Sequence, residues 1–346
     1  MGGEIYQARN EIKNLQKPNL MNRVFSLLIS VLLLTSCGND QLILPQSVGS
    51  FGKILVVTDN SKWQGDLGKE IRKTFGRLQA ELPQPEKLIS TAQVAPVGFT
   101  SMFKSTRNIF ILEVSDTTLV RVSRDRYARP QTVVYATAKN EEALLNLIQD
   151  RNQEIIEIFR NADIKYLQNI FSKKRLNDSS YKTLQNLNVS LTIPEEYRKV
   201  DDTGEFLWLR HHLKSGIARG TGSNNILVYS RPLPVEDTIA NGIISMRDSI
   251  GKKYIPGSKE GMYMITEAAY TPVTIKTSLN SYNAFETRGK WEVKNDYMAG
   301  PFLNYAITDT KNNRLLVVEG FTYAPSINKR NFLLELEAIA KSLVIK

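Results

Sequence analysis

The side chains best suited to chemistry are scarce in this chain of 346 residues, which has one cysteine, Cys37, and two histidines, His211 and His212. The histidines are neighbours in an expected strand, so their side chains point to opposite faces and cannot share a metal ion. A Ser-His-Asp arrangement would also depend on one of these two residues. The acidic residues do not have the spacing of a calcium-binding loop. The sequence therefore predicts no metal site, no cofactor and no catalytic residue.

Acidic residues alone offer the remaining route to catalysis. Glycoside hydrolysis requires two carboxylates about 5 to 9.5 Å apart, a requirement that only the folded chain can test for a pair such as Asp59 and Glu113. The glycine-rich segment 220–224 (GTGSN) lacks the lysine and the following helix of a phosphate-binding loop, which favours a hairpin or loop. A glycan-directed hydrolase that uses acidic residues is therefore the alternative to a non-catalytic binding or assembly module.

A group of arginines is the most unusual local composition. Arg121, Arg124, Arg126 and Arg129 lie close together in the sequence, with Asp125 among them. Guanidinium groups bind carboxylates and phosphates bidentately. We therefore treat these arginines as a candidate anionic-ligand surface for lipid headgroups, an anionic glycan or an acidic envelope protein, with a solvated loop as the alternative.

The surroundings of Cys37 are typical of a bacterial lipoprotein signal peptide. Residues 21–23 (MNR) form a short positive segment, residues 24–34 are apolar or small, and residues 34–37 read LTSC. The apolar run is much shorter than the roughly 20 residues that span a membrane. We expect cleavage before Cys37, acyl chains such as palmitate on Cys37, and a location in the cell envelope, at the outer membrane facing the periplasm.

Composition supports an exported globular protein. The formal net charge is +10, with 42% hydrophobic and 23% charged residues. A basic chain favours anionic surfaces such as phospholipid headgroups, whereas scattered basic residues on an exported protein argue against nucleic acid. The membrane, reached through the N-terminal lipid, is therefore the expected partner.

Hydrophobic patterns predict an α+β fold of two layered domains, mostly antiparallel sheet with packed helices. In the first half we expect strands at 53–58, 87–94, 107–114, 118–122 and 132–138, and helices at 61–75 and from Asn140 onwards. In the second half we expect strands at 189–193, 205–213, 225–230, 262–266, 284–293, 302–308 and 315–323, and helices at 235–252 and 331–342. The first half reads β-α-β-β-β-α, which favours an α+β layer over alternating parallel units.

Polar segments divide the chain. Residues 172–180 (SKKRLNDSS) suit a linker between a first domain at 51–171 and a second domain at 181–346. Residues 1–20 read as an extension upstream of the initiator Met21, residues 21–36 as the signal peptide, and residues 37–50 as a tether.

Several segments together resemble a family of Bacteroidetes lipoproteins, the domain of unknown function DUF4837. They are the LTSC motif and residues 53–63 (KILVVTDNSKW), 128–131 (ARPQ), 300–302 (GPF) and 320–325 (GFTYAP). The resemblance extends over residues 37–346 and implies no activity. Residues 193–197 (IPEEY) and 206–208 (FLW), with the closing strand and helix, are similar to α/β domains of the PsbP and Mog1 kind, which implies an accessory or binding module.

Overall fold

The structure, a computed structural model, describes residues 44–213 and 222–346, and residues 45–346 form one compact unit. Cys37, the signal peptide and part of the glycine-rich segment lie outside the described residues. Within the described part of the chain, no helix is long and apolar enough to cross a membrane.

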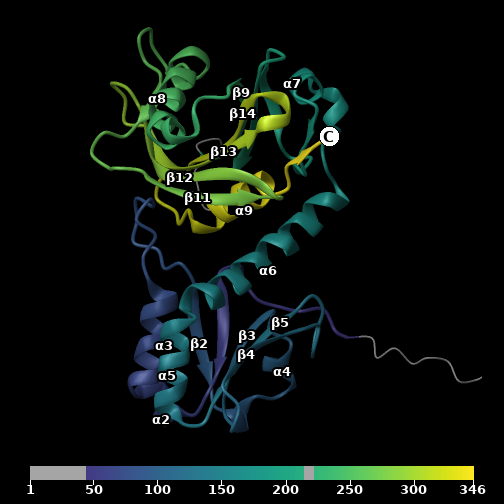
Figure 1. The fold of residues 1–346 in the computed structure, drawn as a ribbon, viewed down its shortest axis with the longest axis vertical. Coiled ribbons are helices and arrows are strands. Elements are labelled where there is room, and N and C mark those ends of the chain that lie inside the picture. Colours follow the sequence, from purple (N-terminus) through teal and green to yellow (C-terminus); the bar gives the residue numbers. More distant parts are fainter. Residues whose placement is uncertain (1–43, 214–221) are drawn as a thin grey trace, which may run out of the picture. The chain divides into compact units, whose positions relative to one another are not determined.

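Five described strands of the first half form one sheet, in the order β2-β1-β3-β5-β4 (Figure 1). The strands are β1 (Lys53–Val57), β2 (Ser90–Val94), β3 (Asn108–Val114), β4 (Leu119–Arg124) and β5 (Thr132–Ala138). The first four in this order run parallel, and only β4 is antiparallel to its neighbour β5.

This sheet departs from the expected antiparallel arrangement, although the α+β class of the whole chain is confirmed. Parallel neighbours need crossover connections. The connection from β2 to β3 is built from short elements that the sequence pattern did not predict, the 3-10 turn η1 (Pro96–Gly98) and α4 (Ser101–Lys104). The predicted helix at 61–75 is in fact α2 (Asn60–Gln64) followed by α3 (Asp66–Gly76), with Gly65 between them.

The two faces of the first sheet are covered differently. Helices α3, α5 (Glu141–Asp150) and α6 (Asn152–Lys173) pack on one face, where the rings of Phe75, Phe110 and Phe159 meet edge to face. Phe99, Phe103 and Tyr127 cover the other face. Asn140 caps α5, as expected, because its side chain accepts a hydrogen bond from the Ala143 amide at 2.8 Å.

Eight described strands form the second sheet, which is antiparallel throughout. Their order is β10-β12-β13-β14-β9-β8-β7, and β11 also pairs with β12. The strands are β7 (Arg198–Asp202), β8 (Phe206–Leu213), β9 (Gly222–Pro232), β10 (Met264–Thr266), β11 (Val273–Leu279), β12 (Tyr282–Val293), β13 (Ala299–Asp309) and β14 (Arg314–Tyr323). A separate short pair joins β6 (Val189–Ser190) to β15 (Val344–Ile345).

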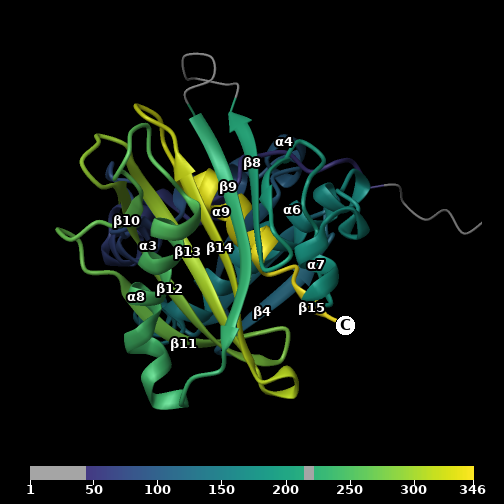
Figure 2. The ribbon, with the colours of Figure 1, turned by 90° about the horizontal axis from the view of Figure 1, so that it is seen from above.

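Helices cover both faces of this second sheet as well (Figures 1 and 2). Helix α8 (Glu236–Tyr254) packs on one face, and α7 (Lys182–Asn186) and α9 (Arg330–Ala340) pack on the other. Gly320 of β14 permits a close approach of α9, because a Cβ atom there would lie 2.7 Å from the Leu336 Cβ atom. The face toward α9 carries the candidate site described below.

Helix α6 takes part in the cores of both halves. Its first turns bury Ile155 and Phe159 against the first sheet, while Ile164 and Leu167 pack against Leu334 and Ala338 of α9. The Gln168 side chain also donates a hydrogen bond to the Ala338 carbonyl oxygen at 2.9 Å. This helix therefore fixes α9, and with it the second sheet, to the first half.

Candidate functional site

A groove of about 710 Å³ lies between the end of α6, residues 194–197, the end of β8 and the helix α9. We call it the α6–α9 groove. Ile170, Phe171, Leu213 and Phe332 give it an apolar wall. Lys173 and Lys174 line it as well, and Lys174 pairs with Glu195 at 3.4 Å. A volume of this size falls in the range of about 300 to 1,000 Å³ that is usual for small-molecule sites.

Tyr197 and Glu335 are largely buried polar residues in the lining of this groove. Tyr197 is only 1% exposed, and its hydroxyl has no hydrogen bond of normal geometry within the described residues. Burial raises the pKa of Tyr197 well above its ordinary value, with a further increase from the charge of Glu335, while the nearby Asn224 amide opposes this change. The Tyr197 hydroxyl is therefore neutral, and its proton has no acceptor among the described residues.

Glu335 is held next to Asn224, a fully buried residue of β9. The Asn224 amide nitrogen lies 3.4 Å from Glu335 Oε2, and its carbonyl oxygen accepts a hydrogen bond from Thr322 at 2.8 Å. Burial raises the pKa of Glu335 to about 7, the Asn224 bond opposes this increase, and the charge of Glu196 adds to it. Near neutral pH, Glu335 can therefore either donate or accept a proton in a hydrogen bond.

Of the two histidines and the acid pair named from the sequence, only His211 lines this groove. His211 lines the groove, with its ring 5.5 Å from the Tyr197 ring, whereas His212 is exposed. Asp59 pairs with Lys62 at 3.1 Å, and Glu113 is an exposed residue of β3. No group of three or more histidines, cysteines or acids in the described ranges is placed to hold a metal ion.

The four arginines of the candidate anionic-ligand surface lie on β4, the edge strand of the first sheet, and on the loop that follows it. All four are exposed. The Arg121 guanidinium lies over the Tyr135 ring at 4.0 Å, and Arg124 donates a hydrogen bond to Thr132. Arg129 pairs with Asp125 at 3.1 Å. Their role in binding stays a prediction.

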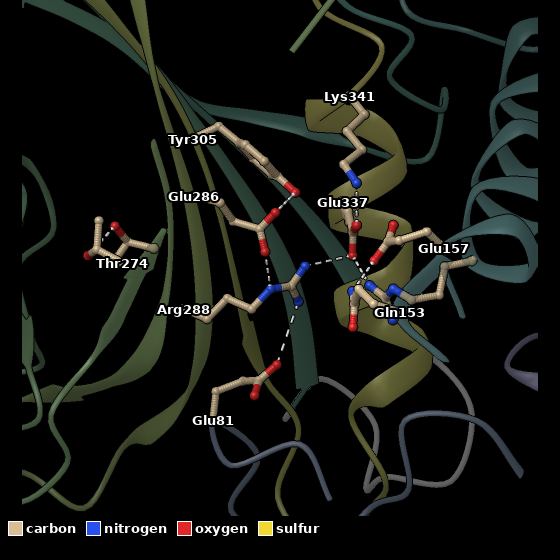
Figure 3. Close-up of polar contacts among 11 residues, drawn as sticks. Glu81, Gln153, Glu157, Thr274, Glu286, Arg288, Tyr305, Glu337 and Lys341 are labelled. Carbon is tan, nitrogen blue, oxygen red and sulfur yellow. Dashed lines mark hydrogen bonds and ion pairs between the residues drawn. The ribbon is translucent and has the colours of Figure 1, made fainter. Parts of the chain in front are cut away.

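A second group of charged residues joins the two halves and is centred on Arg288 of β12 (Figure 3). We call it the Arg288 cluster. Its members are Glu81, Arg160, Glu286, Arg288, Tyr305, Glu337 and Lys341. The Arg288 side chain lies 2.8 Å from Glu337 and 3.5 Å from Glu81, and it also pairs with Glu286.

The charges of the Arg288 cluster compensate one another. Burial disfavours the charged form of Glu337, but Arg160, Arg288 and Lys341 more than offset this and hold its pKa well below the usual range. The Tyr305 hydroxyl donates to Glu286 at 2.7 Å. Glu337 is therefore a permanent carboxylate and cannot serve as a general acid, so we interpret the cluster as a structural connection.

Sequence analysis did not identify Tyr197, Asn224 or Glu335. One signal was present in α9, whose residues Arg330–Ala340 read RNFLLELEAIA. Glu335 and Glu337 interrupt a helix that is apolar on most of its circumference, and acids in such a helix must be buried or adjacent to a buried face. Tyr197 and Asn224 come from distant segments and carry no comparable signal.

Comparison with known families divides the chain in the same way as its two sheets. Residues 176–342 match the model described as Domain of unknown function (DUF4837). Residues 47–172 match a different model, Domain of unknown function (DUF8532). The expected resemblance is thus confirmed for the DUF4837 segment, while residues 53–63 and 128–131, which also suggested it, fall in the DUF8532 segment.

Similar solved structures include the Ran-binding protein Mog1p of Saccharomyces cerevisiae, with a TM-score of 0.31 and 7% identity over 46% of this chain and 90% of that chain. LpqN, described as involved in cell envelope biogenesis of Mycobacterium tuberculosis, has a TM-score of 0.29 and 10% identity over 46% of this chain and 83% of that chain. No curated protein matches the chain significantly. We draw no functional conclusion from likenesses at this level.

Proposed function

We propose that this protein is a non-catalytic binding module of the cell envelope, anchored by lipid at Cys37, and that the α6–α9 groove is its ligand site. The observation that carries the ligand site is the combination of an apolar wall with two largely buried polar residues, Tyr197 and Glu335, in a groove of about 710 Å³. Such a combination is the usual form of a small-molecule site. The signal-peptide pattern before Cys37 supports the anchor and the envelope location.

The polar groups define the chemistry of the ligand. A buried hydroxyl without a partner costs about 1 to 3 kcal/mol. The Tyr197 hydroxyl has no partner among the described residues, and a ligand acceptor would recover this free energy once the side chains that cover the hydroxyl move aside. The protonated form of Glu335 would donate to the same kind of atom. The expected ligand therefore has an apolar body, which contacts Phe171, Leu213 and Phe332, and a carbonyl, ester or similar acceptor at its inner end.

A dye-binding assay tests the groove. The full-length chain with Cys37→Ala, which carries no acyl group, is titrated with the neutral apolar dye N-phenylnaphthylamine. Ile170 is 39% exposed and lines the groove, so Ile170→Glu places a charge on the apolar wall, and we expect at least tenfold weaker binding. Val97→Glu is the matched control, because Val97 is 92% exposed and does not line the groove. Equal affinities for the two variants would refute the assignment.

A hydrolase that uses acidic residues is the second candidate, and Glu335 is the observation in its favour. Glycosidases pair one protonated carboxyl group with one carboxylate, and Glu335 shares the groove with the exposed residue Glu196. An envelope glycan is incubated with the wild-type protein and with Glu335→Gln. Glycan cleavage that is lost in Glu335→Gln, with dye binding retained, would establish the hydrolase; no cleavage by either protein supports the binding module.

A further inference from the structure

The chain enters the first half directly beside the loop that follows β4 and carries Arg126 and Arg129. We call this segment the arginine loop. The Arg129 amide donates to the Pro45 carbonyl oxygen at 2.8 Å, and the Ser47 amide donates to the Arg129 carbonyl oxygen at 3.1 Å. Val48 continues along Thr106, and its amide donates to the Ser105 carbonyl oxygen at 2.9 Å. In Figure 1 the purple beginning of the described chain accordingly runs past β5. Pro45 is therefore fixed to the loop that carries Arg126 and Arg129.

The length of the preceding chain limits how far this loop can lie from an anchor at Cys37. Cys37 precedes Pro45 by eight residues, and a fully extended chain spans at most about 3.5 Å per residue, or about 28 Å in total. This step rests on the lipid anchor of the proposed function. A lipid on Cys37 keeps Pro45, and Arg129 bonded to it, within that distance of the membrane surface.

Basic side chains gather at this edge of the sheet. Arg124 of β4 pairs with Thr132 at the beginning of β5, so it lies at the same end of the sheet as Thr106 and Arg129. Lys104 joins them, since its ammonium group lies 5.5 Å from the Tyr127 ring. Arg121 lies three residues back along β4, and its side chain projects over the Tyr135 ring on the opposite face of the strand from Arg124. Asp125 is paired with Arg129, and no described acid forms an ion pair with Arg121, Arg124 or Arg126.

The arginine loop is held in a defined conformation. The Gln131 side chain accepts from the Tyr127 amide at 2.8 Å and donates to the carbonyl oxygens of Lys104 and Thr106 at 2.7 Å each. The Gln131 amide donates to Asp125 at 2.8 Å. Met102, 72% exposed, lies one turn before Ser105 and adds an apolar side chain near the same edge. The basic groups are thus positioned before any partner binds.

We propose that this surface, formed by Lys104, Arg121, Arg124, Arg126 and Arg129, contacts anionic phospholipid headgroups of the membrane that holds the Cys37 anchor. Phosphates are ligands that guanidinium groups bind well, and basic residues beside a membrane anchor add to its attachment through the negative surface potential. The lipid would limit the distance between the protein and the membrane. The arginines would set the orientation of the protein, with the end of the sheet that carries Arg124 and Thr132 toward the bilayer.

The test measures vesicle binding by the full-length chain with Cys37→Ala, so that acylation makes no contribution. Vesicles of phosphatidylcholine alone are compared with vesicles that also contain phosphatidylglycerol, at low salt, by cosedimentation. The variant carries Arg121→Gln, Arg124→Gln, Arg126→Gln and Arg129→Gln. The matched control removes the same charge from exposed lysines elsewhere, through Lys165→Gln, Lys199→Gln, Lys259→Gln and Lys311→Gln.

We expect binding to the anionic vesicles to fall at least tenfold in the arginine variant and less than threefold in the lysine control. Added salt should weaken wild-type binding, because exposed charges are screened over about 8 Å at physiological ionic strength. Equal binding of the arginine variant and the wild type, or an equal loss in the lysine control, would overturn the proposal. So would wild-type binding that does not depend on phosphatidylglycerol.

Two further measurements keep the outcomes separate. If the quadruple variant does not fold, Arg121→Gln with Arg126→Gln decides instead, since the described contacts of these two guanidinium groups are with the Tyr135 and Tyr127 rings. A threefold loss would support the proposal and an unchanged affinity would reject it.

Fatty-acid labelling of the wild type and of Cys37→Ala tests the anchor by itself, so failure of the anchor and failure of the arginine surface are distinguishable.

Discussion

The protonation of Glu335 links the groove to pH. The folded state raises its pKa from 4.5 to about 7, so the folded protein holds this proton more tightly than the unfolded chain does. Stability from this group is complete below about pH 4.5 and falls as the pH rises toward 7. Glu335→Gln should therefore be more stable than the wild type at pH 8, by at most about 3 kcal/mol, and should show no such gain at pH 4.

Urea unfolding at pH 4, 6 and 8 measures this difference. Glu113→Gln, a change at an exposed carboxylate of β3, is the control and should alter stability little at any of the three pH values. Parallel pH profiles for the wild type and Glu335→Gln would contradict the assigned protonation.

Glu337 has the opposite pH dependence. Its pKa is lowered by Arg160, Arg288 and Lys341 against the effect of burial, so its contribution is present above the ordinary carboxyl pKa and is lost as the pH falls below about 4.5. Glu337→Gln leaves these cations without their shared partner and should cost about 3 to 5 kcal/mol at pH 7. Denaturant unfolding tests this, with Glu154→Gln as control, because the Arg151–Glu154 pair is exposed to solvent and should contribute little to stability.

At this scale the sequence predicts exposed features better than buried ones. The arginines of β4 and its loop could be named because their composition is local. Glu335, Tyr197 and Asn224 could not be grouped, because the groove combines α9, a turn and β9, and their proximity depends on the tertiary fold. The raised pKa of Glu335 likewise depends on burial that no local pattern records.

At the scale of the elements, a substitution at Gly320 tests the packing of α9 on β14 in the second core. Gly320→Ala would bring a methyl group to 2.7 Å from the Leu336 Cβ atom, and both elements are buried there. We expect a loss of about 1 to 3 kcal/mol from overpacking. Gly242→Ala in α8 is the matched control, since no atom lies within 4 Å of its added methyl group. It should be neutral or stabilising by up to about 1 kcal/mol, and an equal loss in both variants would contradict this account.

Element positions were largely predictable, whereas their pairing was not. Continuous apolar runs such as β1 and β5 gave correct strands, and the spacing of Leu144, Leu147 and Ile148 gave α5. The parallel order of the first sheet depends on crossovers through α2, α3 and α4. Helix α4 has only four residues, too few for a helical period to be visible in the sequence.

At the scale of the whole chain, the two halves should unfold together. Helix α6 contributes to both cores, and the Arg288 cluster joins Glu81 and Arg160 of the first half to β12 and α9 of the second. Ile148→Ala in the first core should lower stability by about 2 to 4 kcal/mol. Hydrogen exchange should show the same loss in amides of β3 and of β14, although β14 is far from the change in sequence.

The control for this prediction is Ile275→Ala, a change at a residue of β11 that is 52% exposed, which should leave both sets of amides nearly unchanged. If β14 keeps its full protection in Ile148→Ala, the halves unfold independently and the contacts of α6 with α9 are weaker than their burial suggests.

The sharing of α6 has a practical consequence for work with the separate segments. The two family matches meet between residues 172 and 176, near the end of α6. A recombinant second half that begins at that point therefore loses the helix that covers Leu334 and Ala338. Such a piece should present an uncovered apolar strip, form aggregates on concentration and bind to hydrophobic resin. A piece that begins near residue 161 keeps Ile164 and Leu167 over α9 without exposing Ile155 and Phe159, and it should stay monodisperse.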